Sequence, residues 1–162
     1  MGDLDSAQFR KVLGHFPTGV TVVTGQADGK VQGLTIGSFT SVSLDPPLVG
    51  FFPAKTSESW PDIEKSGAFC VNVLSEKQVD LCWRFAKEGD DRFDGVVWRP
   101  ASSGSPIIQG VVAWIDCDID NVVEAGDHWF VMGRVRELEV EGDTEHGPML
   151  FFRGKLGGFS GE

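Results

Sequence analysis

GLTIGSFTSVSLDPPLVGFF occupies residues 33–52 and predicts several strands in quick succession. Three strands are expected, over residues 31–37, 38–44 and 47–53. The DPP step at residues 45–47 separates the second strand from the third, because proline cannot donate a hydrogen bond to a strand ladder. This stretch therefore predicts a sheet built from consecutive strands rather than from alternating strands and helices.

The regions on either side add further strands and three short helices. Upstream, residues 6–16 carry apolar side chains at helical spacing, with Ser6 as the expected N-cap and Pro17 as the stop. A run rich in β-branched residues then begins at Gly19. Downstream, helices are expected over residues 57–66 and 75–86. Further strands are expected over residues 68–74, 107–125, 128–141 and 149–153.

This pattern predicts a mainly β fold. Because the strands do not alternate regularly with helices, a doubly wound parallel sheet is disfavoured. A closed or nearly closed barrel of antiparallel strands fits better, since closure removes exposed sheet edges. We expect residues 149–153 to close the sheet and ELEVE at residues 137–141 to form a half-buried strand. No linker or repeat is visible, so residues 1–162 are interpreted as one domain.

Composition excludes several classes of function. Lys and Arg total 14 against 24 Asp and Glu, and the net charge of −10 repels nucleic acid and anionic lipid. No apolar run approaches the length of a membrane span, and the N-terminus is too polar for a secretory signal. Cys70, Cys82 and Cys117 form no CxxC pair and are interpreted as reduced, mostly buried thiols of a cytoplasmic protein.

Common nucleotide, hydrolase and metal motifs are absent from the sequence. No GxGxxG follows a strand, GQADGK at residues 25–30 is too short for a P-loop, and no GxSxG occurs. His15, His128 and His146 stand far apart without an HExxH motif, so no metal site is predicted.

Two segments have the chemistry of a ligand site. In residues 33–43, small residues would let the backbone approach a flat ring, although an ordinary Ser- and Thr-rich hairpin has the same pattern. In residues 53–60, Lys55 and three hydroxyls stand at an expected helix start, which is typical of a phosphate site. The alternative there is a capped helix with a solvated lysine.

Three further residues are weaker candidates. His128, in the GDHW turn at residues 126–129, could bind a substrate amide or anion, or could be an incidental turn residue. Asn72 lies among apolar neighbours in a strand, where its amide must bond either the backbone or a cofactor. Arg84 stands near the end of a helix, where a cation also favours the helix dipole.

Taken together, six segments in this order resemble the flavin reductase domain family. The segments are FRKVLGHFPTGVTVVT, GLTIGSFTSVSLDPPLVGFF, KTSESW, FCVNVL, GSPIIQG and GDHWFVMGRV. The resemblance covers residues 8–159. The family includes the reductase components of two-component flavin monooxygenases. One departure is the absence of tyrosine, because Phe152 and Leu156 stand in the last strand where the family often has tyrosine.

The resemblance implies an FMN-binding split barrel that forms a homodimer with the flavin near the subunit interface. It implies hydride transfer from NADH or NADPH to FMN or FAD, with the reduced flavin passing to an oxygenase component. The alternative is a split-barrel protein that binds flavin or haem without catalysis, for which His128 is the one candidate axial ligand.

The resemblance also implies roles for individual residues. Thr35, Ile36, Gly37 and Ser38 would line the edge of the isoalloxazine, and Ser41 and Val42 would follow the ring and the ribityl chain. Lys55, Thr56, Ser57 and Ser59 would hold the phosphate. His128 would lie near the nicotinamide, and Asn72 and Arg84 are further candidates for cofactor binding.

Overall fold

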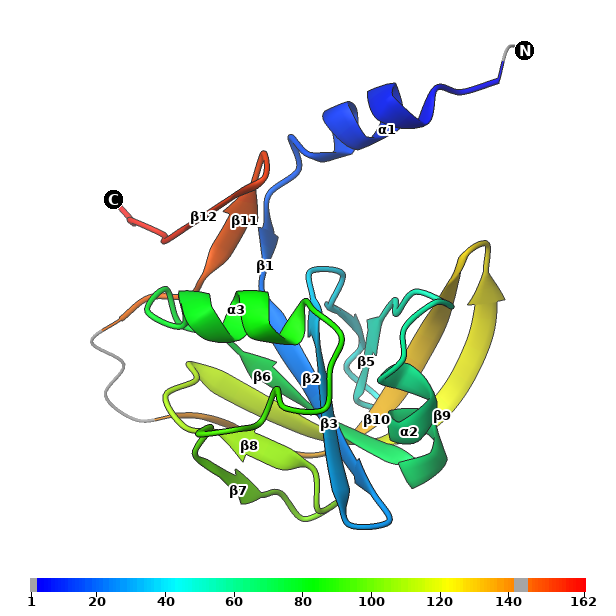
Figure 1. The fold of residues 1–162 in the computed structure, drawn as a ribbon, viewed down its shortest axis with the longest axis vertical. Helices are drawn as coiled ribbons and strands as arrows, with labels where there is room; N and C mark the ends of the chain where they lie inside the picture. Colours follow the sequence, from blue (N-terminus) through cyan, green and yellow to red (C-terminus); the bar gives the residue numbers. More distant parts are fainter. Residues whose placement is uncertain (1–2, 142–145) are drawn as a thin grey trace.

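The computed structural model describes residues 3–141 and 146–162, and its centre is a sheet of seven antiparallel strands (Figure 1). The order across the sheet is β3-β2-β6-β9-β10-β5-β4. The strands are β2 (Thr21–Ala27), β3 (Lys30–Ile36), β4 (Thr40–Ser43), β5 (Leu48–Phe51), β6 (Ala68–Val73), β9 (Ala113–Ala125) and β10 (His128–Val140). The prediction of a mainly β, antiparallel fold is confirmed.

The connection between the two edge strands forces this sheet to curl. In a flat sheet β3 and β4 would lie about 29 Å apart, given strand spacings of ~4.8 Å. They are joined only by residues 37–39, and the chain from Ile36 to Thr40 can reach at most about 14 Å. The sheet therefore bends until its two edges approach. No ladder joins β3 to β4 in the described residues, so the barrel is split along this seam.

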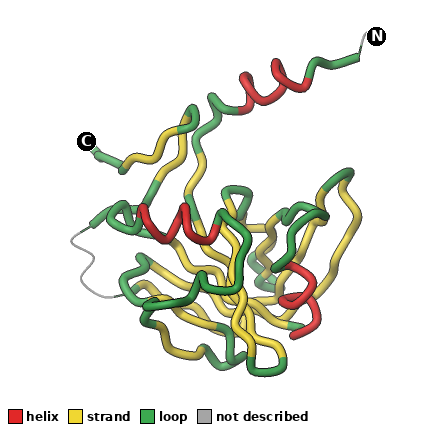
Figure 2. Tube along the Cα trace, in the orientation of Figure 1, coloured by secondary structure: helices red, strands yellow, loops and turns green. Residues whose placement is uncertain are grey.

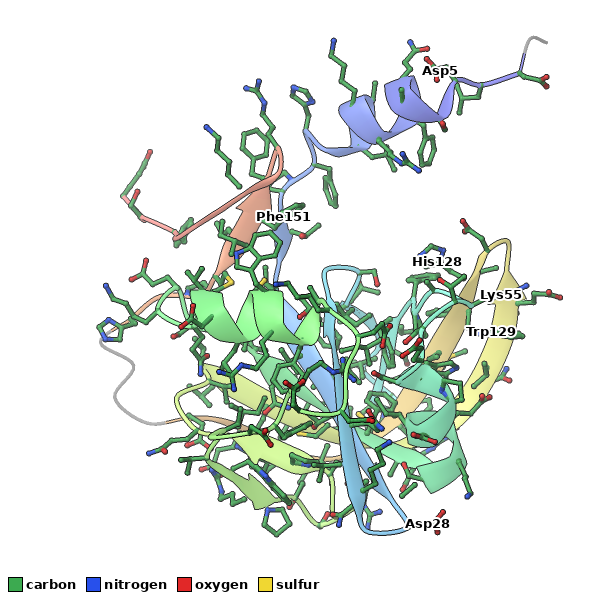
Figure 3. All side chains as sticks on the ribbon, in the orientation of Figure 1. Asp5, Asp28, Lys55, His128, Trp129 and Phe151 are labelled. Atoms are coloured by element: carbon green, nitrogen blue, oxygen red, sulfur yellow. The ribbon has the colours of Figure 1, made fainter. Side chains whose placement is uncertain are left out.

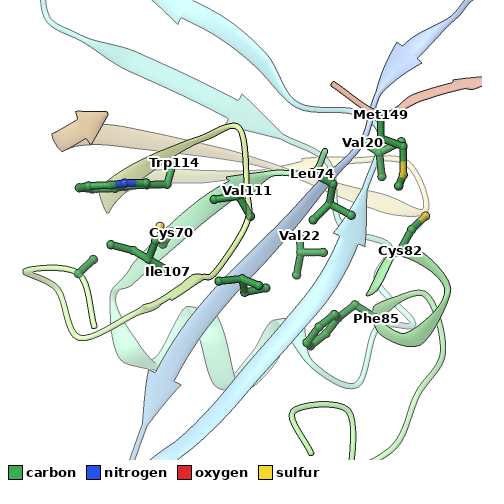
Figure 4. Packing of buried hydrophobic residues seen from close by; sticks show 12 residues of the cluster. Val20, Val22, Cys70, Leu74, Cys82, Phe85, Ile107, Val111, Trp114 and Met149 are labelled. Carbon is green, nitrogen blue, oxygen red and sulfur yellow. The ribbon is translucent and has the colours of Figure 1, made fainter. Parts of the chain in front are cut away.

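The curled sheet is buried on both faces. Along β2, Val23 belongs to the core enclosed by the barrel, while Val22 belongs to an outer core that also holds Leu74, Phe85 and Trp114 (Figure 4). The inner core draws its side chains from six of the strands and from α2 (Trp60–Ser66). This double burial fixes which face of each strand can be exposed to a ligand.

The three helices begin later or are capped differently than the sequence predicts. In α1 (Ser6–Leu13) the N-cap is Asp5 rather than Ser6, because the Asp5 carboxylate accepts a hydrogen bond from the Ala7 amide at 3.0 Å. The helix expected from residue 75 is α3 (Val79–Phe85). Ser75 does not cap it but pairs with Pro148 in an isolated bridge.

The helix expected over residues 57–66 is shorter, because α2 starts at Trp60. Pro61 lies in its first turn as predicted, and Ile63 is fully buried. The Ser57 hydroxyl accepts a hydrogen bond from the Trp60 amide at 3.2 Å. Residues 53–59 are consequently a loop, and that loop carries most of the predicted phosphate site.

Two strand predictions were wrong in arrangement. Residues 107–125 are not one strand but β8 (Pro106–Ile108), which pairs with β7 (Trp98–Pro100), followed by β9. Residues 149–153 do not close the main sheet. They contain β11 (Leu150–Phe152), which pairs with β1 (Thr18–Gly19) and β12 (Lys155–Gly157) in a separate sheet of three strands.

This small sheet and α1 form an arm that stands apart from the barrel (Figures 1 and 2). No residue of α1 is buried. The arm exposes seven large apolar side chains, which are Phe9, Val12, Leu13, Phe16, Phe151, Phe152 and Phe159.

The strand at residues 137–141 was expected to be half-buried, and it is not. Leu138 and Val140 are 62% and 68% exposed in the single chain. Within residues 3–141 and 146–162, no helix is long and apolar enough to cross a membrane.

Candidate active site

The outer face of β3 carries small residues because α3 packs against it. A side chain at Gly33 would overlap the Phe85 ring, with a Cβ-to-carbon distance of 2.9 Å. Two residues on, the Thr35 hydroxyl donates to the Cys82 carbonyl at 2.7 Å. Strand alternation places Gly37 on the same face, beyond the reach of these contacts. The contacts fix α3 beside β3 and leave space over the end of the strand.

Residues 37–39 leave the sheet at this point and are held by a side chain. Ser38 Oγ accepts from the Phe52 amide at 3.0 Å and lies 3.4 Å from the Phe52 carbonyl, to which it donates. These bonds join the seam to the chain that follows β5. Since residues 37–39 lie between the β3 and β4 ladders, their backbone groups are not used for strand pairing.

The loop after β5 and the hairpin between β9 and β10 form a second wall. The Trp129 amide donates to the Pro53 carbonyl at 2.9 Å, and the Lys55 amide donates to the Asp127 carbonyl at 3.0 Å. Ala54 and His128 form an isolated bridge between these two bonds. Two segments about 70 residues apart, which the sequence suggested separately, are thus one unit (Figure 3).

The Lys55 ammonium is engaged on this hairpin. It pairs with the Glu124 carboxylate and lies 4.9 Å from the centroid of the Trp129 ring (Figure 3). The hydrogen bond and the positive charge of Lys55 lower the pKa of Glu124 below its usual value. An anionic ligand that recruits Lys55 must therefore compete with Glu124.

His128 also has a local carboxylate partner. Its Nδ1 lies 2.7 Å from Asp127 Oδ1, and this contact lowers the pKa of the Asp127 carboxyl through the hydrogen bond and the nearby charge. With Nδ1 occupied, Nε2 is the ring nitrogen available to a ligand.

These elements enclose an open cavity of about 450 Å³ at the seam. Seven predicted site residues line it, which are Thr35, Ile36, Gly37, Ser38, Thr56, Ser57 and His128. The sequence reasoning missed six other lining residues, which are Leu34, Phe52, Ala54, Phe85, Ala86 and Glu88. Leu34, Phe52 and Ala54 lie within the quoted segments. Phe85, Ala86 and Glu88 come from the end of α3 and carry no ligand signal in the sequence.

Other predicted residues lie outside this lining. Ser59 is buried and accepts from Arg92. Asn72, fully buried in the outer core, donates to the Val22 and Pro106 carbonyls at 3.2 and 3.1 Å and accepts from the Ile108 amide at 2.8 Å. Its amide is satisfied mainly by the backbone, the first of the two alternatives left open by the sequence.

The remaining candidates lie elsewhere on the barrel. Arg84 donates to the Asp94 carbonyl at 2.7 Å and lines a separate surface hollow with Lys87 and Trp83. Ser41 and Val42 are exposed on β4. Among the residues described, no group of three or more His, Cys, Asp or Glu side chains could hold a metal ion.

A larger groove of about 650 Å³ lies in the arm rather than at the seam. It is lined mainly by β11, β12 and the turn between them, including Phe152, Arg153 and Lys155, and by none of the predicted site residues. Size alone would favour this groove. The arm has little support within one chain, however, so the seam cavity, held by hydrogen bonds on both walls, is the better-defined binding site.

Comparison with known proteins agrees with this architecture. Residues 13–160 match the sequence model of the flavin reductase like domain. A flavin reductase of Pseudomonas putida is 57% identical over 158 residues, covering 97% of this chain and 92% of that protein. The crystal structure of nitrilotriacetate monooxygenase component B from Mycobacterium thermoresistibile superposes with a TM-score of 0.93 at 47% identity, covering 96% of this chain and 87% of the other.

A third comparison includes cofactors. The NADH:FAD oxidoreductase SgcE6 of Streptomyces globisporus, in complex with NAD and FAD fragments, has a TM-score of 0.89 at 37% identity, with 98% of each chain covered.

The split barrel, the seam cavity and these relatives together define the class. The chain belongs to the flavin reductase like domain family. It is an enzyme, a flavin reductase that takes a hydride from a reduced nicotinamide nucleotide and uses flavin as its other cofactor. Of the two functions that the sequence left open, the catalytic one is confirmed.

The residues at the seam fit a flavin. The apolar side chain of Phe52, which is partly exposed, suits a planar ring, while the backbone of residues 37–39, which lies outside the strand ladders, suits its polar edge. The hydroxyls of Thr56 and Ser57 suit a phosphate, with Lys55 nearby. A bound flavin would supply the ring that accepts the hydride, and the protein would supply binding, alignment and charge stabilisation.

Proposed function

We propose that the seam cavity is the flavin site of this reductase. The observation that carries the proposal is that two walls meet in one cavity. One wall is the end of β3 (Thr35 and Ile36) with residues 37–38, which lie outside the strand ladders, and the other is the 53–59 loop fixed to the hairpin. The first wall would bind the edge of the isoalloxazine through backbone groups. The second would bind the phosphate through Thr56 and Ser57. This division follows from the lining of the cavity and from the donors each wall offers.

We propose that Lys55 binds the flavin phosphate by exchanging its ion pair with Glu124 for one with the phosphate. Ion pairs near the surface contribute little to stability, so giving up Glu124 costs little when a phosphate is available. Glu124 would keep the ammonium near the site until a flavin arrives. Lys55 would then contribute a charged hydrogen bond to phosphate, which is stronger than a neutral one.

His128 is proposed to contact the nicotinamide through Nε2. Its place on the cavity lining, and the anchoring of Nδ1 by Asp127, support this role. Ser41 and Val42 would contact the part of the ligand that extends along β4. For Ser59, Asn72 and Arg84 we propose structural roles, because their polar groups already have partners within the chain.

The reduced flavin is proposed to pass to an oxygenase component. The relative from Mycobacterium thermoresistibile is itself a monooxygenase component, and the seam cavity is open enough for release of a ligand. A coupled assay tests this, since NADH oxidation by this chain should support a flavin-dependent oxygenase added in a separate chamber behind a dialysis membrane. Activity only on direct contact would contradict free release.

The working form is proposed to be a homodimer. An eight-residue helix is marginal on its own, yet α1 stands apart from the barrel with its apolar side chains exposed. The arm carries four cationic side chains, whereas the chain as a whole has a net charge of −10. The four are Arg10, Lys11, Arg153 and Lys155. A second copy offers both the acidic surface and the exposed Leu138 and Val140 that would cover the arm.

The cytoplasm is the proposed location. All three cysteines are free and buried, as in proteins of reducing compartments. Cell fractionation with an antibody to the chain tests this location.

The flavin site is tested by binding and turnover measured together. We expect the purified chain to quench FMN or FAD fluorescence and to oxidise NADH or NADPH only when flavin is present. Crossing both nicotinamides with FMN, FAD and riboflavin identifies the preferred pair. Gly37→Leu adds a large side chain at a residue that lines the cavity. If this variant quenches flavin fluorescence as the wild type does, the flavin binds elsewhere.

A further inference from the structure

Arg92 is buried between the segments that line the seam cavity. It is 7% exposed and lies in the loop that follows α3. A guanidinium has five N–H donors, and each of them has an acceptor here. The acceptors are the Gly89 carbonyl at 2.9 Å, the Gly33 carbonyl at 2.7 Å, the Lys87 carbonyl at 3.1 Å, Gln32 Oε1 at 3.2 Å and the Ser59 hydroxyl.

These acceptors adjoin three walls of the cavity, although none of them is a lining residue. The walls are the ring wall (residues 34–38), the phosphate wall (Thr56 and Ser57) and the α3 wall (Phe85, Ala86 and Glu88). Gln32 and Gly33 lie on β3, directly before the lining residues that start at Leu34. Ser59 ends the 53–59 loop, two residues after Ser57 of the phosphate wall. Lys87 and Gly89 flank Glu88, which lines the cavity from the α3 side. One side chain therefore ties together the ring wall, the phosphate wall and the α3 wall.

The chemistry of these bonds requires arginine. All five acceptors are neutral, so the bonds hold backbone and side-chain dipoles rather than neutralise a carboxylate. Lysine offers three donors from one point and cannot span acceptors on three segments. Arg92 also lies over Phe85, with its guanidinium carbon 6.0 Å from the ring centroid, and Phe85 lines the cavity.

We propose that Arg92 is a positioning residue that sets the distance between the ring wall and the phosphate wall, and thereby gives the enzyme its preference for phosphorylated flavin. This inference rests on the proposed flavin site. A flavin with a phosphate touches both walls and depends on their spacing. Riboflavin touches only the ring wall, so it is insensitive to that spacing.

The test compares FMN and riboflavin binding in wild type and in Arg92→Lys, by fluorescence quenching. We expect the FMN dissociation constant to rise about tenfold, equivalent to ~1.4 kcal/mol, with little change for riboflavin. Arg99→Lys is the matched control, since Arg99 pairs with Glu141 on the β7 side of the barrel, and it should leave both constants unchanged. An equal loss for both flavins in Arg92→Lys overturns the proposal.

A second variant separates positioning from direct contact with the ligand. Ser59→Ala removes the acceptor on the phosphate wall and should also weaken FMN selectively. If Arg92 acts through Ser59, the double variant should lose no more FMN affinity than Arg92→Lys alone. Fully additive losses of FMN affinity in the double variant overturn the proposal. An unchanged ratio of the FMN and riboflavin dissociation constants in Ser59→Ala also overturns it. The Ser59→Ala measurement remains informative if Arg92→Lys does not fold.

The outcomes also distinguish this proposal from that of the flavin site. If the wild-type chain binds FMN and riboflavin equally, or binds neither, the proposed phosphate wall itself is wrong. If the wild type prefers FMN and Arg92→Lys retains that preference, only the role of Arg92 is wrong.

Discussion

Lys55 and His128, two of the ligand candidates suggested by the sequence, both have carboxylate partners on the hairpin between β9 and β10. The pairing of Lys55 with Glu124 could not be predicted, because Glu124 becomes a neighbour of the 53–59 loop only through the bridge between Ala54 and His128. Arg92 was missed for a related reason. A single arginine in a polar loop resembles a solvated residue until its five acceptors come together.

Replacing Lys55 tests the phosphate role. Lys55→Ala should weaken FMN more than riboflavin, since a charged hydrogen bond contributes ~1.5–3 kcal/mol. Glu124→Gln is the matched variant and should leave FMN binding equal or tighter, because it removes the competing carboxylate. Isothermal titration with both flavins measures these effects. Equal losses for FMN and riboflavin in Lys55→Ala would assign the lysine to holding the hairpin only.

Replacing His128 tests the nicotinamide role. His128→Ala should raise the KM for the nicotinamide several-fold while the flavin dissociation constant stays the same. Asp127→Asn should act in the same direction but more weakly, because it loosens the ring without removing Nε2. Steady-state kinetics with each nicotinamide supply the comparison, and unchanged KM values in both variants would make His128 an incidental turn residue.

At the scale of elements, the sequence predicted most strands and all three helices but not their ends or partners. The pattern of apolar and polar residues indicates which faces of a strand are buried, and so the positions of β2, β3, β5, β6 and β10 along the chain were predicted closely. The pattern does not indicate which strands pair with one another. Residues 149–153 were therefore assigned to the wrong sheet. The sequence also did not indicate that residues 107–125 are divided into two strands, β8 and β9.

One glycine on β10 shows how closely the barrel is packed. A side chain at Gly133 would overlap the Phe69 ring inside the barrel and also Cys117. We expect Gly133→Ala to reduce the free energy of unfolding by ~1–3 kcal/mol, as for other overpacked cores. Gly19→Ala is the control, because nothing lies within 4 Å of the added Cβ. Urea denaturation measures both, and equal midpoints would contradict this packing.

Across the whole molecule, burial should make the three cysteine thiols unreactive. Burial raises the pKa values of Cys70, Cys82 and Cys117, that of Cys117 to about 12. Because burial raises the pKa of these thiols, they stabilise the fold at pH values below the pKa of an unfolded thiol, near 9. This stabilisation is lost as the pH rises toward the pKa in the folded state. We expect a thiol reagent to label no cysteine at neutral pH until denaturant is added, and stability to fall above about pH 9. Rapid labelling of the native chain would contradict this burial.

The arm gives the clearest prediction about assembly. Leu138→Glu and Phe16→Glu should each shift the chain toward a monomer in analytical ultracentrifugation, because each puts a charge on a surface proposed to be covered. Val97→Glu is a control, since Val97 is equally exposed but lies outside the arm and outside the 137–141 strand. A wild-type chain that sediments as a monomer at micromolar concentration would exclude the homodimer.

A crystal structure with FMN bound would show whether the flavin ring lies at the seam between β3 and β4. We expect the ring against residues 35–38 and the phosphate beside Thr56 and Ser57, with Lys55 turned from Glu124 toward the phosphate. A flavin bound in the β11–β12 groove, with residues 37–39 packed shut, would contradict it.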